Sequence, residues 1–529
     1  MRIFLTSLFF LFFVSFLQSQ TTFEKLYSDS ITTSFYFSGG SGNIAHLPDS
    51  GYIYVNSAFK AGNSCILMGR LDKTGNVLWS KSIDDTKHIF YPKVTVSPTN
   101  LIYISCSSVD PLTSNFCSTI LKFDLAGNLV WSKTYGSSTT THQVVNVIPH
   151  SNSLFLAGNS YSIGAGNGDL FMQRTDTNGN IIWGITYNSN GDESLISSKK
   201  LLNNDMLICS NTVDSNGEYL TFYRIDINGN VVWNTRLRGA NYEQIIGQGL
   251  NEDVEGNILA TGFIDSIPGV GLGLWDIFVL KLSQAGVFKW GKLYGGNEYD
   301  EGWGIFPNKD KGYTVIAEPE SYGSISRIAL FKIDSLGNTS WAKLYGNPST
   351  GGFPNHTLQN KDGGYTIYAT NGDYSALAPM YLIKSDSLGN TTCPHVSVNL
   401  LSNNFNLIMD SPKTLGTLTG TLSYTPPIFS KSLTVNDYCP PLSIERINEN
   451  IYDVSIYPNP NNGSFILQSN SENKNNFLVM YNLIGQKIHE EKIDKGTNVI
   501  HTVNLPKGLY YYAILQNKTQ IQTGKIVIE

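Results

Sequence analysis

Acidic side chains recur at a fixed distance from three tryptophans of this chain. Ten residues beyond the tryptophan in each case stand Glu193 after Trp183, Glu243 after Trp233, and Asp300 after Trp290. Carboxylates that a repeating fold brings together can line a shared mouth and bind a cation or a polar ligand. Alternatively, each carboxylate accepts backbone N–H groups and fixes the connection between two repeats. The sequence leaves both interpretations open.

Aromatic side chains accompany these acids. Tyr242, Tyr299 and Trp303 lie close to them in the sequence, and aromatic rings are enriched where proteins contact their partners. The candidate ligand-binding residues are therefore Glu193, Glu243, Asp300 and Trp303.

The other polar residues match no common catalytic or metal-binding motif. The eight histidines show no His-Glu-x-x-His spacing, and neither Gly-x-Ser-x-Gly nor Cys-x-x-Cys occurs. Glycine-rich segments at 164–168 and 269–273 have the composition of a phosphate loop, but no helix follows them to supply an anion site. We therefore predict no catalytic residue, no metal ligand set and no cofactor.

Calcium is the one ion for which a faint pattern exists. Asp176-Thr-Asn178-Gly-Asn180 and the matching segment at 226–230 carry closely spaced side-chain oxygens. A calcium loop also needs a bidentate glutamate at a fixed offset, and these segments lack it. Turn formation explains them better, because Asp and Asn side chains hydrogen-bond the backbone of a turn.

These segments belong to an eight-residue pattern, Asp-x-x-Gly-Asn-x-x-Trp, that recurs along the chain. Its copies begin at Asp72, Asp124, Asp176, Asp226, Ser283, Asp334 and Asp386, at spacings of 52, 52, 50, 57, 51 and 52 residues. The copy at Ser283 is decayed, and the copy at Asp386 lacks the tryptophan. A period of about fifty residues predicts seven structural units.

Each unit reads as four short strands. In the unit that ends at Trp183, apolar runs occupy 144–148, 154–157, 169–173 and 181–183, separated by Gly, Asn or Ser. The Asp-x-x-Gly-Asn segment supplies the turn before the fourth strand, where Gly takes the positive φ that other residues resist. Such a sheet cannot bury both faces alone, and radial stacking solves this. The predicted fold is all-β, with a seven-bladed β-propeller over residues 21–393.

The last unit lacks a fourth strand, and the beginning of the mature chain could replace it. Phe23-Glu-Lys25-Leu-Tyr27 matches Trp341-Ala-Lys343-Leu-Tyr345. We therefore expect residues 22–27 to complete the last blade and close the ring, which leaves no open sheet edge. A linear β-solenoid is the alternative, and it would not need this displaced strand.

The units resemble the bacterial β-propeller repeat family. That resemblance rests on segments such as Asp276-Ile-Phe-Val-Leu-Lys281, the glycine turn with its tryptophan, and Tyr294-Gly295-Gly296. It covers residues 22 to about 393. It implies a fold and leaves the activity undefined, because propellers carry unrelated functions.

Residues 451–529 form a module of different character, which we expect to be a small β-sandwich. Its distinctive residues are Tyr457, Pro458, Asn459, Pro460, Gly485, Gly508, Tyr510 and Lys525. With these motifs the module resembles the type A C-terminal sorting domain of the type IX secretion system, the Por secretion tail of Bacteroidota. The resemblance implies recognition by that secretion machinery and a secreted or cell-surface destination. An ordinary immunoglobulin-like domain is the alternative.

The remaining segments fit an exported protein. Residues 1–20 have the charged start, apolar stretch and polar exit of a signal peptide, and no later segment is long enough for a membrane span. Residues 394–450 read as a β-rich connector and linker. Two disulfides are candidates, Cys106 with Cys117 and Cys393 with Cys439, whereas Cys65 and Cys209 lie in apolar runs.

Composition limits the partners. The formal net charge is -6 and no cluster of Lys and Arg interleaved with aromatics occurs, so nucleic acid is not an expected partner. We expect a non-enzymatic module that binds glycan or protein. The alternative is a propeller enzyme, either quinoprotein-like, as the Gly75 to Trp79 spacing allows, or a glycan-active hydrolase or lyase. Seven units and the lack of an adjacent cysteine pair speak against a quinoprotein.

Overall fold

The computed structural model divides the chain into two compact units, residues 1–442 and 443–529. It describes residues 21–29, 35–36, 44–60, 63–84, 89–109, 116–135, 142–161, 168–187, 191–215, 217–239, 242–266, 271–323, 327–346, 351–371, 379–404, 407–410, 415–417, 421–423, 428–431, 433–437, 454–469, 476–482, 486–502, 505–516 and 519–529. The expected signal peptide and Cys439 lie outside these residues. Every regular element in them is a strand, so the predicted all-β class is confirmed.

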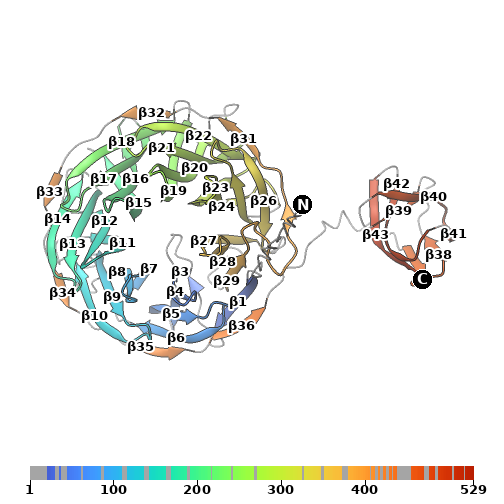
Figure 1. The fold of residues 1–529 in the computed structure, drawn as a ribbon, viewed down its shortest axis with the longest axis horizontal. Helices are drawn as coiled ribbons and strands as arrows, with labels where there is room; N and C mark the ends of the chain where they lie inside the picture. The colour runs from blue at the N-terminus through green and yellow to red at the C-terminus, as the bar shows by residue number, and fades with distance from the viewer. Residues whose placement is uncertain are drawn as a thin grey trace, which may run out of the picture. The chain divides into compact units, whose positions relative to one another are not determined.

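In the described residues the first unit contains seven antiparallel sheets, which Figure 1 shows arranged radially around a common centre, as in a β-propeller. Sheet 1 contains β2 (Phe35–Tyr36), β3 (Ile44–His46), β4 (Tyr52–Lys60), β5 (Asn63–Leu71) and β6 (Val77–Asp84). Sheet 2 contains β7 (Ile89–Val96), β8 (Ile102–Val109), β9 (Phe116–Phe123) and β10 (Leu129–Tyr135). Sheet 3 contains β11 (His142–His150), β12 (Ser153–Ser160), β13 (Asp169–Asp176) and β14 (Ile181–Tyr187). Sheet 4 contains β15 (Asp192–Lys200), β16 (Met206–Asp214), β17 (Gly217–Ile225) and β18 (Val231–Gly239).

Sheet 5 contains β19 (Tyr242–Glu252), β20 (Ile258–Ser266), β21 (Trp275–Leu282) and β22 (Phe288–Gly295). Sheet 6 contains β23 (Asp300–Pro307), β24 (Tyr313–Pro319), β25 (Ile328–Ile333) and β26 (Thr339–Tyr345). Sheet 7 contains β27 (Gly352–Gln359), β28 (Tyr365–Asn371), β29 (Met380–Ser385) and, from the other end of the chain, β1 (Phe23–Asp29). Each sheet from the second to the sixth is an antiparallel meander, because its four repeat strands pair in chain order.

The recurring turn lies within each sheet and packs that sheet against its neighbour. In the copy at Asp124, the carboxylate accepts the N–H groups of Ala126 and Asn128, and Gly127 takes a φ of 74°. A side chain on Gly127 would lie 2.8 Å from the ring of Trp79, which comes from the preceding sheet. The motif tryptophan therefore covers the glycine turn of the following sheet, so one set of residues shapes the turn and packs two sheets together.

Strand β1 makes the same contacts from the opposite end of the chain. It pairs antiparallel with β29, with Phe23 opposite Lys384. Its Phe23 ring covers Gly75, the Tyr27 hydroxyl donates to the Gly75 carbonyl at 2.5 Å, and Lys25 donates to Asn76 at 2.8 Å. In a regular repeat, Tyr135 donates to the carbonyl of Gly179 at 2.8 Å in the equivalent way. The N-terminal segment thus occupies the place of the missing fourth strand of sheet 7.

Apolar clusters lie between the sheets. Seven clusters of buried residues each join two neighbouring sheets. One of them contains Phe23, Tyr52 and Leu382, and so joins sheet 7 to sheet 1. The cores are therefore built from pairs of sheets rather than from any single sheet, as a four-stranded unit requires.

The segment after the repeats forms an outer belt, which we define as strands β30 to β36. These strands are β30 (Val396–Ser397), β31 (Leu401–Asn404), β32 (Leu407–Asp410), β33 (Leu415–Thr417), β34 (Thr421–Ser423), β35 (Ile428–Lys431) and β36 (Leu433–Asp437). They pair in turn with the outermost strands of sheets 6, 5, 4, 3, 2, 1 and 7. The belt therefore passes every sheet in the reverse order of the chain (Figure 1). It covers edges that would otherwise present unpaired backbone groups.

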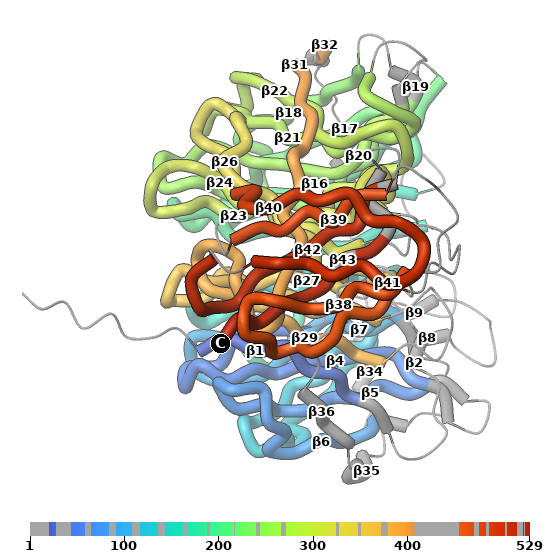
Figure 2. The backbone as a smooth tube through the Cα atoms, turned by 90° about the vertical axis from the view of Figure 1, so that its right-hand side faces the viewer, coloured from blue at the N-terminus to red at the C-terminus, as the bar shows by residue number. Residues whose placement is uncertain are grey.

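The second unit is a sandwich of two sheets around one apolar core. One sheet contains β37 (Val454–Tyr457), β38 (Ser464–Ser469) and β41 (Gly496–His501). The other contains β39 (Asn476–Tyr481), β40 (Lys487–Ile493), β42 (Gly508–Gln516) and β43 (Thr519–Ile528). In Figure 2, β39, β42 and β43 lie side by side, in agreement with their pairing.

The cysteines differ in part from expectation. The thiols of Cys106 and Cys117 form no disulfide, so that predicted pairing is wrong. Cys106 lies opposite Thr119 and Cys117 lies opposite Ser108, so the two are offset along neighbouring strands instead of directly opposed. Cys393 is disulfide-bonded.

Candidate functional site

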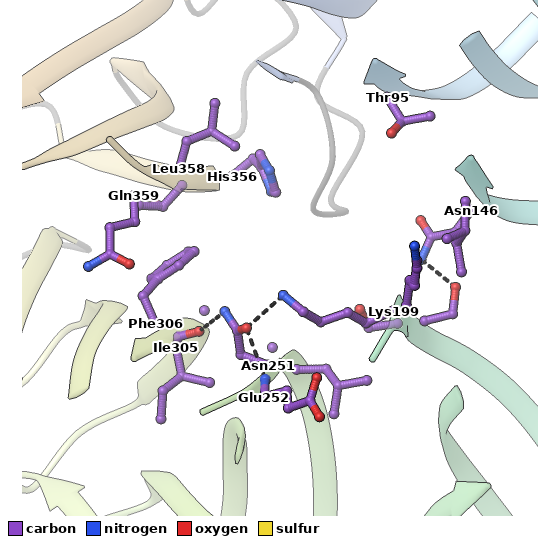
Figure 3. A pocket seen from close by; sticks show the side chains of 18 of the residues that line it. Thr95, Asn146, Lys199, Asn251, Glu252, Ile305, Phe306, His356, Leu358 and Gln359 are labelled. Atoms are coloured by element: carbon purple, nitrogen blue, oxygen red, sulfur yellow. Dashed lines mark hydrogen bonds between the residues drawn. The ribbon is translucent and has the colours of Figure 1, made fainter. Parts of the chain in front are cut away.

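A cavity of about 930 Å³ lies at the centre of the ring of sheets. All seven of the innermost strands β3, β7, β11, β15, β19, β23 and β27 contribute to its wall. Figure 3 shows side chains from several of these strands around the open centre, among them Asn146, Lys199, Asn251, Phe306 and His356. The sheet architecture therefore converts seven local strands into one shared site.

Six of these inner strands carry a β-bulge at matching places. The pairing register shifts at Tyr91–Pro92 in β7 and, in the strands that follow, at Val145, Ile196, Gln248, Trp303 and Asn355. We call these residues the bulge row. A bulge inserts an extra residue and changes the direction of the side chains beside it. The residues that follow the bulge row directly are Lys93, Asn146, Ser197, Gly249, Gly304 and His356, and each lines the cavity.

A second cavity of about 440 Å³ adjoins the bulge row. It includes Tyr91, Gln143, Tyr161 and Ile196 in its wall. Lys93, Gln248 and Trp303 line both cavities, which places these three side chains between the two.

Hydrogen bonds made by side chains tie most inner strands to their neighbours. Lys199 donates to Asn251 at 2.7 Å, and Asn251 donates to the Ile305 carbonyl at 2.8 Å. The Asn146 amide and the Ser198 hydroxyl lie 3.1 Å apart. Figure 3 shows these bonds as dashed lines. On the other side of the ring, the Gln359 carbonyl lies 3.2 Å from a ring nitrogen of His46. Many polar groups of the wall therefore hold the ring together.

Three carboxylates stand in or beside the wall, and all three are engaged. Asp253 pairs with Lys281 at 2.9 Å. Glu252 accepts the N–H of Leu202 at 2.6 Å, and Glu301 accepts a hydrogen bond from Gln248 at 2.8 Å. Burial raises the pKa of Glu252 and of Glu301. The two acids belong to opposite ends of the inner strands, because Glu252 lies four residues beyond Gln248 on β19, about 13 Å of strand.

The cationic side chains of the wall are less well paired than its carboxylates. Burial lowers the pKa of Lys93 to about 8, and it also lowers the pKa of Lys199. Burial, together with the positive charges of Lys93 and His46, lowers the pKa of His356 to about 3. Burial likewise lowers the pKa of His46. Both histidines are therefore neutral at physiological pH, and the cationic charge of the cavity comes from lysines.

The acids predicted from the sequence lie elsewhere. The Asp300 carboxylate is fully buried, and it accepts hydrogen bonds from the Gly296 N–H at 2.7 Å and from the Ser321 hydroxyl and N–H at 2.6 and 3.2 Å. Burial raises the pKa of Asp300. Its oxygens are thus occupied by the connection between sheets 5 and 6, which matches the structural interpretation more closely than the ligand-binding one.

Glu193 is not brought together with Asp300 in one pocket of the described residues. Glu193 is buried at the beginning of the β15 segment, and its N–H donates to the Gly168 carbonyl at 2.8 Å. Glu243 lies within β19, but its side chain, like that of Tyr242, lies outside the described residues. Glu193 does not line the central cavity.

The predicted aromatic residues take two different places. Trp303 reaches the central cavity, and its indole N–H finds no hydrogen-bond partner in the described part of the chain. Tyr299 is 41% exposed and meets the Trp275 ring edge-on, with centroids 4.9 Å apart. Trp275 in turn stacks on Phe263 at 4.4 Å.

The turn at Asp176 uses its oxygens internally. One carboxylate oxygen accepts the N–H groups of Asn178 and Asn180 at 2.9 and 2.8 Å, and the other accepts the Asn180 side-chain amide at 2.8 Å. Burial acts to raise the pKa of Asp176, but the hydrogen bonds from Asn180 outweigh it and lower the pKa. No group of three or more His, Cys, Asp or Glu suited to a metal ion occurs among the residues that the structure describes.

The distinctive residues of the second unit hold its ends together. Asn459 donates to the Lys525 carbonyl at 2.7 Å and accepts the Val527 N–H at 2.8 Å, so the Tyr457–Pro460 segment is fastened to β43. The Tyr510 hydroxyl donates to the Pro506 carbonyl at 2.6 Å. Gly508 begins β42, and Gly485 lies outside the described residues. Tyr457 and Lys525 are exposed.

Sequence reasoning missed most of the cavity wall. The missed residues stand in the first strands of their repeats, where a single polar residue looks like part of an exposed face. They are Lys93, Asn146, Lys199, Asn251 and His356. A usable pattern was nevertheless present. Lys199 and Asn251 are 52 residues apart, as are Asn146 and Ser198, so polar partners occupy neighbouring copies at about one repeat.

Several solved structures are similar to the chain. One is polysaccharide lyase Uly1, with 10% identity over 70% of this chain and 99% of that chain and a TM-score of 0.42. Another is an α-L-arabinanase from Penicillium chrysogenum, with 10% identity over 70% of this chain and 99% of that chain and a TM-score of 0.42. An α-L-arabinofuranosidase from Fusarium graminearum is similar over 60% of this chain and 98% of that chain, with 10% identity and a TM-score of 0.38. Likeness at this level assigns no activity to the chain.

No curated protein matches the sequence. No helix long and apolar enough to cross a membrane occurs in the described ranges. Residues 455–529 match a family described as the secretion system C-terminal sorting domain, the Por secretion tail. The predicted sorting domain is thereby confirmed, and it indicates export by type IX secretion to the cell surface or the extracellular space.

Proposed function

We propose that the chain is an exported, seven-bladed β-propeller, closed by strand β1, that binds a glycan in its central cavity without catalysing a reaction on it. Residues 1–20 act as the signal peptide, residues 21–393 supply the blades, residues 394–450 supply the belt and linker, and residues 451–529 address the protein to the type IX machinery. The seven inter-sheet clusters and the pairing of β1 with β29 support the closed ring.

The observation that carries the proposal is the central cavity. Its volume of about 930 Å³ falls in the range of small-molecule sites and suits a short oligosaccharide. Its wall offers amide and hydroxyl groups beside the apolar surfaces of Trp303 and Phe306. Sugars present hydroxyl groups at their edges and C–H groups on their faces, so a wall of this mixed character can hold them.

The geometry favours binding over hydrolysis. Most glycosidases need two carboxylates within about 5 to 10 Å on either side of one bond. Asp253 is paired with Lys281, and about 13 Å of strand separates Glu252 from the Gln248 that contacts Glu301. Each acid is also engaged within the protein. His356 is a poor general base, because its pKa is held near 3.

The test is a glycan array probed with the mature full chain, followed by titration calorimetry on the ligands retained. Trp303→Phe should weaken binding several-fold, whereas Trp131→Phe, at the outer turn contact, should leave the affinity unchanged. The bound glycan should be recovered intact by mass spectrometry. Failure to retain any glycan would remove the proposal, and recovery of shortened or unsaturated products would establish the enzyme alternative instead.

Export can be tested separately. Deletion of residues 455–529 should leave the protein in the periplasm, and fusion of the same residues to a periplasmic reporter should release that reporter to the surface or the medium. Secretion without the sorting domain would contradict this part of the proposal.

A further inference from the structure

Lys93 is the most unusual group of the central cavity. It follows the bulge of β7 directly and lines both cavities. No acceptor or carboxylate of the described residues lies within bonding distance of its ammonium group, whereas Lys199 has Asn251 at 2.7 Å. A lysine that is enclosed without a partner costs free energy, so a fold keeps such a group where it serves a purpose.

The side chains near Lys93 do not neutralise it. The charge of Lys93 contributes to lowering the pKa of His356, and burial lowers the pKa of His46. Both histidines therefore remain uncharged at neutral pH. Lys199 and Lys200 add positive charge from β15, while Glu252 is the opposing carboxylate of the wall that forms no salt bridge with another described residue. Asp253, the other carboxylate, pairs with Lys281 at 2.9 Å. The cavity is therefore net cationic.

A neutral donor lies on the neighbouring inner strand. Asn146, the neighbour of Lys93 in the row after the bulges, contributes an amide. Trp303 lines both cavities together with Lys93, but its indole N–H is buried. An ammonium group combined with a neutral N–H donor is the usual chemistry of anion recognition in a partly dry site.

We propose that Lys93 and the cavity beside it bind the anionic group, carboxylate or sulfate, of an acidic saccharide. This inference rests on the proposed glycan-binding function and specifies its ligand class. Lys93 supplies the charge, and the Asn146 amide, which also follows a bulge directly, supplies a hydrogen bond. The ligand neutralises the lysine, which explains why the protein provides no carboxylate for it.

Matched ligands test this inference. Short oligomers of glucuronate, galacturonate and mannuronate are titrated into the full chain beside their methyl esters, which keep the shape and remove the charge. Sulfated galactose oligomers and their unsulfated forms distinguish the second source of the anion. We expect the acid to bind about 10 to 100 times more tightly than its neutral counterpart, the ratio for a charge-assisted hydrogen bond. Lys93→Met should remove that ratio and Lys93→Arg should restore most of it.

Lys309→Met is the matched control, because Lys309 is exposed in the turn between β23 and β24 and should leave both affinities unchanged. Preserved strand content by circular dichroism shows that the variants fold. Equal binding of acid and ester overturns the Lys93 site and leaves the glycan function standing. If no saccharide binds, malonate is titrated alone. Binding that Lys93→Met abolishes then supports the anion site without the glycan function, and no binding overturns both.

Discussion

Replacing Lys93 by methionine should stabilise the propeller unit at neutral pH. Methionine keeps the unbranched length of the side chain and removes the charge. Lys93 lies in the wall of the central cavity, and burial lowers its pKa to about 8. The natural chain therefore carries a charge that its folded state disfavours.

The size of the effect follows from that pKa. An exposed lysine titrates near 10.5, and each tenfold change in proton affinity corresponds to about 1.4 kcal/mol, so a charged Lys93 costs at most about 3 kcal/mol. Because the side chain keeps some contact with solvent in the cavity, we expect about 1–3 kcal/mol in practice. The folded pKa lies below the unfolded one. The penalty is thus complete below about pH 8 and vanishes above about pH 10.5.

The assay is thermal unfolding of the full chain and the variant at pH 7 and at pH 10.5. We expect the propeller transition of Lys93→Met to lie about 1–4 °C higher at pH 7 and to coincide with that of the natural chain at pH 10.5. Lys309→Met serves as the reference for loss of an exposed charge. A destabilised Lys93→Met variant, or a gain that is the same at both pH values, would refute the account of an unpaired enclosed ammonium group.

Three further perturbations address the frame. Gly127→Ala should lower the free energy of unfolding by about 1–3 kcal/mol, since the new methyl group would lie 2.8 Å from Trp79 at a φ of 74°; unchanged stability in urea would contradict this. Cys393 should be found joined to Cys439 by non-reducing peptide mapping, and Cys393→Ser should cost about 2–4 kcal/mol; a different partner would contradict the pairing. Asp276→Asn should stabilise the fold by about 1–2 kcal/mol at pH 7 and much less at pH 4. Burial raises the pKa of Asp276 to about 6, so the folded state disfavours the carboxylate that forms above that pH. A loss of stability at pH 7 would contradict this.

Local chemistry made much of the frame predictable. The Asp-x-x-Gly-Asn turns, their covering tryptophans and the replacement strand at Phe23 all follow from short-range rules that act again in every copy. The belt followed no such rule. Its strands are two to five residues long, too short for a period, and each is defined by the sheet edge that it meets rather than by its own residues.

The site was less predictable than the frame, for a related reason. Counting from the tryptophans located Asp300, and its environment explains why an acid recurs there, since it fastens a connection between sheets. The cavity depends instead on bulges, which insert one residue without changing the repeat enough to be seen. The bulge before Lys93 decides where that lysine points, and nothing in its immediate sequence reveals it. The predicted disulfide between Cys106 and Cys117 was wrong for a similar reason, because strand register, and not closeness in the chain, decides which residues lie opposite each other.

The distribution of stabilising contacts explains how one cavity can keep an unpaired charge. The turn contacts lie near the outer edges of the sheets, the belt pairs with those edges, and each cluster of apolar residues joins two sheets. In a repeat protein such contacts add up from neighbour to neighbour, so a cost of about 1–3 kcal/mol at one inner strand does not threaten the ring. The residues of the inner strands can then differ from one repeat to the next, as Lys93, Lys199 and Asn251 do at related positions. On the proposed function, specificity for the ligand would belong to the inner strands, while the turns preserve the architecture that brings them together.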